Sequence, residues 1–424
     1  MRRVAILGGA RIPFARANGA YAEASNQDML TAALRALADK FKLKGERIGE
    51  VAAGAVIKHS RDWNLARESA LGAGIHPETP AYDLQRACGT SLSAAAQLAN
   101  RIALGEIDSA IAGGADSTSD IPLGYGRKLQ QLVLKSYRGR SFGQRLAPWL
   151  GLRPGHLKPS TPRTGEPRTG MSMGEHCEEM AKEWKVSRRE QDELALASHR
   201  NAAAAWKEGF FNDLVFEFKN QKTDNNVRGD TTLEKLGALK TAFDPSPAGT
   251  LTAGNSSPLT DGAASVLLAS EEWAKARGLQ PQCFITFTET AAVDFVGMAG
   301  RKEGMLLAPA YAVPRMLDRA RIRLQDFDLY EIHEAFAAQV LCTLKAWESE
   351  EWCRARLGRP ALGSIDRSKM NLKGSSVAVG HPFAATGARI IATLAKQLAQ
   401  RGSGRGLISI CAAGGMGVTA ILER

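Results

Sequence analysis

Cysteine and long apolar runs are two features that this 424-residue sequence has little of. No stretch approaches the roughly eighteen consecutive apolar residues that a transmembrane helix needs. The six cysteines are irregularly spaced, without a C-x-x-C pair or a zinc-ligand spacing. This usage argues against a disulfide scaffold and a cysteine-based zinc site. It predicts free thiols in a reducing compartment, so any special cysteine should be a reactive one.

The sequence also has no recognisable targeting segment at its N-terminus. Within a few residues of Met1 it enters the apolar run 4–7, which predicts a buried strand with a glycine turn after it. We therefore expect a cytoplasmic protein.

The charge is unbalanced, because 55 Lys and Arg residues face 44 Asp and Glu residues and give a net charge of +11. An excess of this kind favours an anionic partner. Nucleic acid is one candidate, but no helix-turn-helix, RNA-binding or zinc-finger pattern accompanies the charge. A phosphate-bearing small molecule needs fewer assumptions, and we expect no nucleic-acid partner. Charge alone does not choose between the two.

Strands and helices alternate over the first 122 residues. Short apolar runs predict strands at 4–7, 51–57 and 109–112. Helical patterns occupy 26–40, 63–73 and 92–103. This alternation is typical of an α/β fold with a mostly parallel sheet.

The middle of the chain has a different composition. Residues 127–168 hold ten Lys or Arg and a single Glu, with several Gly and Pro, which predicts a loop-rich excursion with a basic face. A helix should follow, with Ser187 as its N-cap and Glu190 completing a capping box. The α/β pattern resumes near residue 252.

The last hundred residues repeat the first hundred in outline. A polar loop with Cys88 leads into a small-residue helix, a strand and Gly113-Gly114. A loop with His381 leads into a predicted helix at 388–400, a strand at 406–410 and the glycine-rich stretch after Cys411. This similarity in the order of elements indicates a duplicated α/β unit, whose corresponding turns converge on a shared site.

Cys88 lies where an extended segment gives way to a helix of small residues. A thiol at a helix N-terminus meets the positive end of the helix dipole, which lowers the thiol pKa and favours the thiolate. The alternative is a packed core cysteine, the commonest fate of this residue type.

Two further segments carry groups able to move protons. His381 lies between Gly380 and Pro382 on a constrained turn, which suits a general base, although this motif alone favours a loop histidine without a role. Cys411 lies at a strand end beside a glycine-rich turn whose N–H groups can hold an oxyanion; the alternative is a buried strand-end thiol.

A fourth segment, Glu331-Ile332-His333-Glu334-Ala335-Phe336, follows an apolar and acidic run. His333 is expected to open a helix there, either as a site residue or as a helix N-terminal residue without a role. Four further cysteines are interpreted as structural: Cys177, Cys283, Cys342 and Cys353.

Together the four segments resemble the thiolase family, in its order and at roughly its distances. The resemblance covers nearly the whole chain. It includes the segments 252–257 (TAGNSS) and 260–264 (TDGAA), which look like the coenzyme-A segment of that family.

The resemblance implies a role for each residue. Cys88 would be the nucleophile that carries the acyl group as a thioester, His381 the base that takes its proton, and Cys411 the second acid/base. Backbone N–H groups of Cys88 and Ala413 would form one oxyanion hole, with His333 and His381 bordering the other. Ser257 would contact the pantetheine arm.

The resemblance also implies two similar α/β halves in a five-layered αβαβα core. Residues 1–122 and 244–282 would form the N-terminal half, 283–424 the C-terminal half, and 123–243 an inserted loop domain over the acyl-CoA site. Coenzyme A would be a substrate, with no metal or other cofactor. A homodimer or tetramer is expected, possibly with a hydratase/3-hydroxyacyl-CoA dehydrogenase subunit. Residues 127–168 would attract phosphates, dock on a partner or contact a membrane, or be a solvated loop.

Three positions depart from the common family pattern. His333 stands where many members of the family have Asn, and the motif with His is similar to that of the β-subunit of the fatty-acid β-oxidation trifunctional complex. Ala384 and Ala413 stand where Gly is common in the family. The expected activity is therefore cleavage of 3-ketoacyl-CoA in fatty-acid degradation. The alternatives are a short-chain acetoacetyl-CoA thiolase, a ketoacyl synthase and a non-catalytic acyl-CoA-binding subunit. Cys411 argues against a synthase, which does not need a second thiol.

Overall fold

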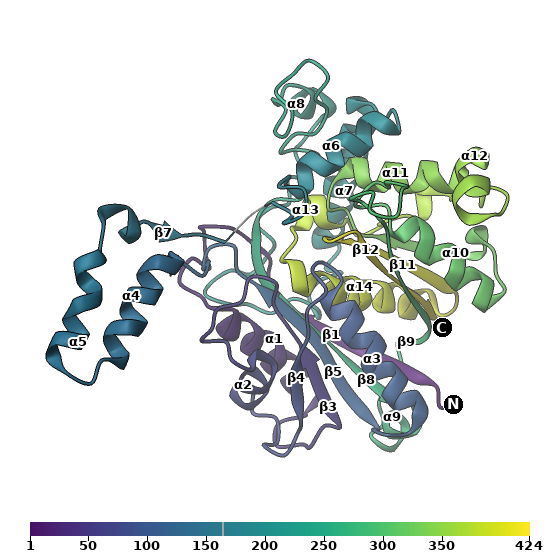
Figure 1. The fold of residues 1–424 in the computed structure, drawn as a ribbon. Coiled ribbons are helices and arrows are strands. Elements are labelled where there is room, and N and C mark those ends of the chain that lie inside the picture. Colours follow the sequence, from purple (N-terminus) through teal and green to yellow (C-terminus); the bar gives the residue numbers. More distant parts are fainter. Residues whose placement is uncertain (163–164) are drawn as a thin grey trace.

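A large twisted sheet forms the centre of the computed structural model, which describes residues 1–162 and 165–424 (Figure 1). Positions 163–164, part of the predicted basic segment, lie outside the described residues. Nine strands follow the order β10-β11-β12-β9-β1-β8-β5-β3-β4, and β2 pairs with β8. The strands are β1 Val4–Arg11, β2 Ala15–Arg16, β3 Glu50–Ala53, β4 Ala81–Asp83, β5 Ser109–Asp116, β8 Thr260–Ser270, β9 Cys283–Ala292, β10 Leu329–Ile332, β11 Arg405–Ala412 and β12 Met416–Glu423.

The sheet is mixed, so the expectation of a mostly parallel sheet is wrong. Among the strands of this sheet that the structure describes, β3–β4, β3–β5 and β10–β11 pair in parallel. The other neighbours are antiparallel, because β11 turns directly into β12 as a hairpin and β8 returns between β1 and β5. A short pairing of β1 with β9 joins the two halves of the sheet.

Helices cover both faces of the sheet and fill the space between its halves, which gives the five layers expected for the fold. The outer layers are α1 and α2 on one half and α10 and α11 on the other. The middle layer is α3 and α14 (Figure 1). These helices are α1 Asn26–Phe41, α2 Leu65–Gly72, α3 Thr90–Leu104, α10 Pro309–Ala320, α11 Ala337–Glu348 and α14 Thr386–Arg401.

Small residues bring the two central helices close together. A Cβ added to Gly387 of α14 would lie 2.4 Å from the backbone nitrogen of Leu92 in α3, so only glycine fits. At the same contact the Ala388 N–H donates to Ser91 Oγ at 2.8 Å. Since Cys88 precedes α3 and His381 precedes α14, this contact sets the distance between their two turns.

Most of the basic segment between residues 127 and 157 is helical, so the expectation of a loop-rich excursion is wrong. It contains α4 Arg127–Arg138 and α5 Phe142–Leu146, held between the short strands β6 Gly124–Tyr125 and β7 Pro159–Ser160. Trp149 Nε1 donates to Ser136 Oγ at 2.9 Å and folds the segment back on itself. This arm, residues 124–160, projects from the body (Figure 1).

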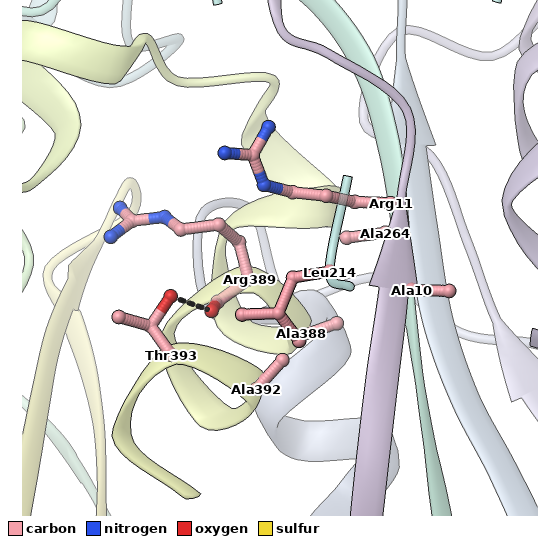
Figure 2. A pocket seen from close by; sticks show the side chains of 8 residues that line it. All are labelled: Ala10, Arg11, Leu214, Ala264, Ala388, Arg389, Ala392 and Thr393. Carbon is pink, nitrogen blue, oxygen red and sulfur yellow. Dashed lines mark hydrogen bonds between the residues drawn. The ribbon is translucent and has the colours of Figure 1, made fainter. Parts of the chain in front are cut away.

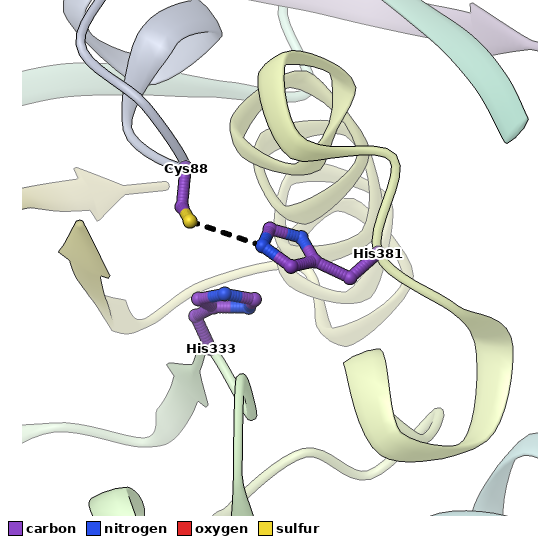
Figure 3. Close-up of side chains that lie close together, drawn as sticks. All are labelled: Cys88, His333 and His381. Atoms are coloured by element: carbon purple, nitrogen blue, oxygen red, sulfur yellow. Dashed lines mark hydrogen bonds between the residues drawn. The ribbon is translucent and has the colours of Figure 1, made fainter. Parts of the chain in front are cut away.

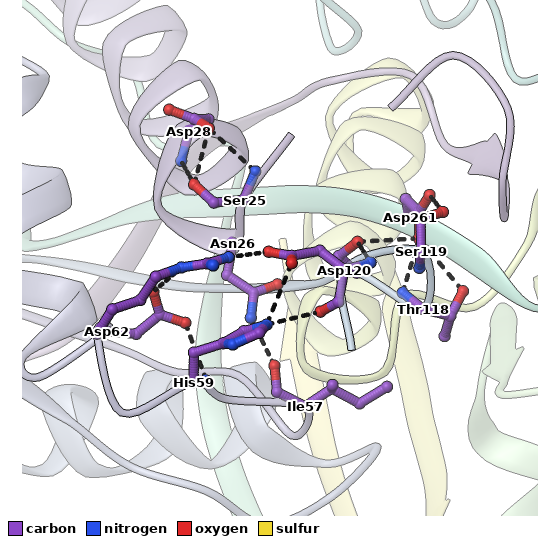
Figure 4. Close-up of polar contacts among 12 residues, drawn as sticks. Ser25, Asn26, Asp28, Ile57, His59, Asp62, Thr118, Ser119, Asp120 and Asp261 are labelled. Carbon is purple, nitrogen blue, oxygen red and sulfur yellow. Dashed lines mark hydrogen bonds and ion pairs between the residues drawn. The ribbon is translucent and has the colours of Figure 1, made fainter. Parts of the chain in front are cut away.

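The link from β5 into the arm is anchored by a buried carboxylate (Figure 4). Asp261 accepts hydrogen bonds from the backbone N–H groups of Thr118 and Ser119 at 2.7 and 3.2 Å. Asp120 pairs with the His59 ring at 3.2 Å. These contacts fix the base of the arm on the N-terminal half.

Helices α6 (Met173–Glu183) and α7 (Arg188–Lys207) of the middle segment pack against α11 of the C-terminal half, whereas Leu214 and Phe216 hydrogen-bond to Arg11 of β1 in the N-terminal half. Ser187 caps α7 and forms the predicted capping box with Glu190. Across the part of the chain that the structure describes, no helix is long and apolar enough to cross a membrane. The remaining helices are α6 Met173–Glu183, α7 Arg188–Lys207, α8 Leu233–Gly237, α9 Glu271–Ala276, α12 Glu350–Trp352 and α13 Ser376–Val379.

Candidate active site

A tight turn between β4 and α3 presents Cys88. Ala87 has a φ of 42°, an uncommon left-handed conformation for a residue with a side chain, and the turn is held by Thr90 Oγ1, which donates to the Ala87 carbonyl at 2.7 Å. Gly89 is required by packing, because a Cβ there would lie 2.7 Å from the Val418 side chain. The nucleophile candidate is therefore fixed immediately ahead of the helix.

The turn that carries His381 is fixed in a similar way. Gly380 has a φ of 100°, and a Cβ there would meet Thr260 at 2.7 Å. The carboxylate of Asp116, at the end of β5, accepts the Ala384 N–H at 2.7 Å and so ties the turn to the N-terminal half. As a result His381 Nε2 lies 3.1 Å from Cys88 Sγ (Figure 3).

Burial keeps this pair neutral in the resting protein. It raises the pKa of Cys88 to about 12, although the N–H groups of Ala413 and Cys88 oppose the shift. Burial, reinforced by the Arg389 cation, lowers the pKa of His381 to about 3. The expectation that the helix N-terminus lowers the pKa of this thiol is therefore wrong, since the loss of hydration outweighs the helix dipole. The pair is a thiol facing an imidazole base.

His333 is the third member of the cluster. It lies in the link between β10 and α11, four residues before that helix, so the expectation that it opens the helix is wrong. Its Nδ1 lies 2.8 Å from Ser376 Oγ, and its ring centroid is 4.2 Å from that of His381. The side chain is completely buried.

Cys411 and Ala413 come from the hairpin between β11 and β12. Gly414 and Gly415 both have positive φ and make the turn tight. Cys411 is buried, and burial together with the neighbouring Cys88 raises its pKa, which keeps the thiol protonated. The N–H of Ala413 faces the sulfur of Cys88. The structure therefore gathers these two residues with Cys88, His333 and His381.

Ser257 lies beside the link that carries His333. Its N–H donates to the Ala335 carbonyl at 3.0 Å, and the residue is half-buried. It therefore borders the cluster from the segment that the sequence associates with coenzyme A. The four cysteines interpreted as structural are buried free thiols.

The distance between the Cys88 thiol and the His381 ring fits a hydrogen bond better than shared coordination of a metal ion. The ligand atoms of Cys88, His333 and His381 all lie within 4.8 Å of one another, and thiol and imidazole are zinc ligands. A tetrahedral zinc ion holds such sulfur and nitrogen atoms about 3.5 Å apart. The observed 3.1 Å is shorter and is a thiol–imidazole contact.

Several supporting residues were missed in the sequence. Arg389 is a buried cation among the small and apolar residues that form the first ten positions of α14, and that unusual position is the signal that would have found it. Ser376 and Thr386 contact the two histidines, and Asn371 binds both backbone groups of Ile332. Hydroxyl and amide groups of this kind carry no sequence signal.

Comparison with known proteins agrees with the geometry. Family models of the thiolase N-terminal domain and the thiolase C-terminal domain match residues 4–272 and 287–424. A 3-ketoacyl-CoA thiolase of Pectobacterium carotovorum subsp. carotovorum is 43% identical, with 99% of this chain and 96% of the relative covered. One of Yersinia pestis is 42% identical, with 99% and 97% covered.

A solved structure shares the whole fold. The acetyl-CoA acetyltransferase of Bacillus anthracis has 31% sequence identity and a TM-score of 0.82, with 100% of this chain and 99% of that chain covered. The fold expected from the resemblance is therefore confirmed. The chain belongs to the thiolase family of acyltransferases.

Proposed function

We propose that this thiolase cleaves 3-ketoacyl-CoA with coenzyme A, releasing acetyl-CoA and a shortened acyl-CoA, in fatty-acid β-oxidation. The observation that carries the proposal is the contact of Cys88 Sγ with His381 Nε2 at 3.1 Å, where the two halves of the fold meet. The names of the relatives from Pectobacterium and Yersinia support the substrate class.

In the first half-reaction, Cys88 gives its proton to His381 and its sulfur attacks the C3 carbonyl carbon of the substrate. The tetrahedral adduct collapses, the C2–C3 bond breaks, and C2 takes a proton from Cys411 to leave as acetyl-CoA. The shortened acyl group remains on Cys88 as a thioester. The raised pKa of Cys411 suits this step, because the group enters it protonated.

In the second half-reaction, the thiol of coenzyme A returns a proton to Cys411 and attacks the thioester. Cys88 leaves as a thiolate and recovers its proton from His381. Every group is then in its starting state. The reaction needs no metal or redox cofactor, and coenzyme A is a substrate.

Two sets of donors would stabilise the negative charge that develops on oxygen. The N–H groups of Cys88 and Ala413 form one oxyanion hole at the thioester, and His333 with His381 borders the other. Ser257 would contact the pantetheine arm as the substrate enters beside the His333 link.

The proposed domain division is the one expected from the resemblance. Residues 1–122 and 244–282 would form the N-terminal half, 283–424 the C-terminal half, and 123–243 the inserted loop domain. The matched family domains, which end at 272 and begin at 287, support a boundary in this region.

The arm at residues 124–160 would make peripheral contact with an anionic membrane. Eleven of the twenty exposed large apolar side chains among the described residues lie between 123 and 157, interspersed with Lys and Arg. Apolar and basic groups together favour such a surface. Leu150→Asp should reduce cosedimentation with phosphatidylglycerol vesicles, whereas Leu104→Asp, on the body, should not. Equal loss in both variants would contradict the assignment.

A cytoplasmic enzyme is proposed, assembled as a homodimer or tetramer that pairs with a hydratase/3-hydroxyacyl-CoA dehydrogenase subunit. The pairing would place successive steps of chain shortening in one complex. His333 in place of Asn supports this branch of the family. Light scattering of the chain alone, and with such a subunit, tests both statements.

The decisive experiment follows coenzyme-A-dependent cleavage of 3-ketoacyl-CoA substrates of four to sixteen carbons. Rapid cleavage of long chains, lost in Cys88→Ala and Cys411→Ala, is the expected result. Cleavage confined to acetoacetyl-CoA would favour the second candidate, a short-chain thiolase. The structural likeness to an acetyl-CoA acetyltransferase supports this second candidate. No cleavage at any length would refute the proposal.

A further inference from the structure

The hydroxyl partner of His381 determines which ring nitrogen carries the proton. Thr386 Oγ1 lies 2.6 Å from His381 Nδ1, and the same hydroxyl donates to the Pro382 carbonyl at 3.3 Å. A hydroxyl has a single hydrogen, so the Thr386 oxygen accepts from His381. The proton therefore lies on Nδ1, and the free lone pair of Nε2 faces the Cys88 thiol.

The hydroxyl partner of His333, Ser376, donates a hydrogen bond to the ring instead of accepting one. The guanidinium of Arg389 donates to Ser376 Oγ at 2.7 Å, and a guanidinium cannot accept. The Ser376 hydrogen is then free for His333 Nδ1, 2.8 Å away, and no other acceptor for it is recorded among the described residues. Nδ1 of His333 therefore accepts, and in the neutral ring the proton lies on Nε2.

His333 is held in that neutral form. Burial lowers its pKa, and the neighbouring His381 and Arg389 lower it further. Within residues 1–162 and 165–424, His333 Nε2 is a buried polar atom without a hydrogen-bond partner. Its N–H is therefore available to donate a hydrogen bond to a substrate oxygen.

Arg389 is directed at serines rather than at a carboxylate. It extends from α14 with Arg11 nearby, and the stems of both line a cavity of about 10 Å³ (Figure 2). Arg11 pairs with Asp224 at 2.6 Å, whereas no carboxylate in the described part of the chain lies within 4.0 Å of Arg389. The guanidinium instead donates to Ser375 and Ser376.

We propose that the two histidines hold opposite neutral tautomers, with His381 as the acceptor and His333 as the donor, and that Arg389 fixes the donor form of His333 through Ser376. Arg389 and Ser376 are thus positioning residues. The assignment rests on the proposed function, because it gives the thiol a base and the developing oxyanion a donor. If both rings held the same tautomer, either the thiol would lack a base or the oxyanion would lack a hydrogen-bond donor.

Neutron diffraction from crystals exchanged into D₂O tests the tautomers without any measurement of activity. Deuterium on Nδ1 of His381, on Nε2 of His333 and on Ser376 Oγ towards His333 is expected. Deuterium on Nδ1 of His333 would overturn the inference. Because the hydrogen positions are seen in the resting protein, this result is independent of whether the chain cleaves 3-ketoacyl-CoA.

Kinetics of three serine variants test the positioning role. Ser376→Ala should lower kcat about 10- to 100-fold with little change in KM, since a single oxyanion donor contributes about 100-fold or more. Ser376→Thr keeps the hydroxyl and should recover most of the rate. Ser375→Ala removes a hydroxyl that binds the same guanidinium and the Ile332 carbonyl but does not contact the His333 ring, and it serves as the matched control. Equal losses in Ser375→Ala and Ser376→Ala, or no loss in Ser376→Ala, would overturn the role.

Discussion

Substitution of Gly387 by alanine should separate the nucleophile from its base. The added Cβ would lie 2.4 Å from Leu92 N and 2.9 Å from both Leu92 Cβ and Ser91 Oγ. The first distance is about 1 Å shorter than the 3.4 Å at which ordinary contact begins, and it involves backbone that cannot rotate away. Helices α3 and α14 must therefore move apart.

The expected loss follows from that displacement. A 1 Å misplacement of reacting groups costs about 100-fold in rate, and overpacking of a core costs about 1–3 kcal/mol of stability. The assay is the initial rate of thiolysis of a long 3-ketoacyl-CoA, together with thermal unfolding. Gly143→Ala, in α5 of the arm, has no atom within 4 Å of the added Cβ and is the matched control.

Two results would refute the reasoning. A Gly387→Ala enzyme with wild-type kcat would mean that the α3–α14 contact does not set the Cys88–His381 distance. A fall in activity in Gly143→Ala as large as that in Gly387→Ala would show that the loss does not come from this contact.

Three further perturbations have defined outcomes. His333→Asn should keep more activity than His333→Ala, because an amide can still donate to the oxyanion, whereas the alanine variant should lose about 100-fold in kcat. Thr386→Val removes the acceptor for His381 Nδ1 and should lower kcat about tenfold at unchanged KM; an unchanged rate would contradict the assigned tautomer. Burial raises the pKa of Glu331 from 4.5 to about 7, so the folded state holds this proton at pH values where the unfolded chain has lost it. The contribution of Glu331 to stability therefore falls as pH rises from about 4.5 to 7, and chemical denaturation of Glu331→Gln should show a flatter decline over this window than wild type.

The sequence predicted the duplicated α/β halves because apolar runs and glycine turns are local signals. It also identified the chemical groups, since Cys88, His381 and Cys411 stand in distinctive small-residue and glycine-rich surroundings. Strand direction was not predictable in this way. Whether β8 runs parallel or antiparallel to β1 depends on long-range pairing, not on local pattern.

The protonation of the site also required the structure. A helix N-terminus lowers a thiol pKa in isolation, but desolvation of the Cys88 thiol where the two halves meet raises this pKa instead. The contacts of Ser376 with His333 and with Arg389 likewise join positions that lie 43 and 13 residues apart in the chain. Such contacts leave no periodic trace in a sequence.

The most direct test of the central claim is to trap the acyl-enzyme. The enzyme is mixed with 3-ketohexadecanoyl-CoA without free coenzyme A, and intact-protein mass and peptide mapping are recorded with acetyl-CoA release. One tetradecanoyl group per chain on Cys88, with an equal amount of acetyl-CoA, is predicted for wild type and for Cys353→Ala, and neither is expected for Cys88→Ala. Release of acetyl-CoA without an acyl group on Cys88, or with the group on another residue, would contradict the account.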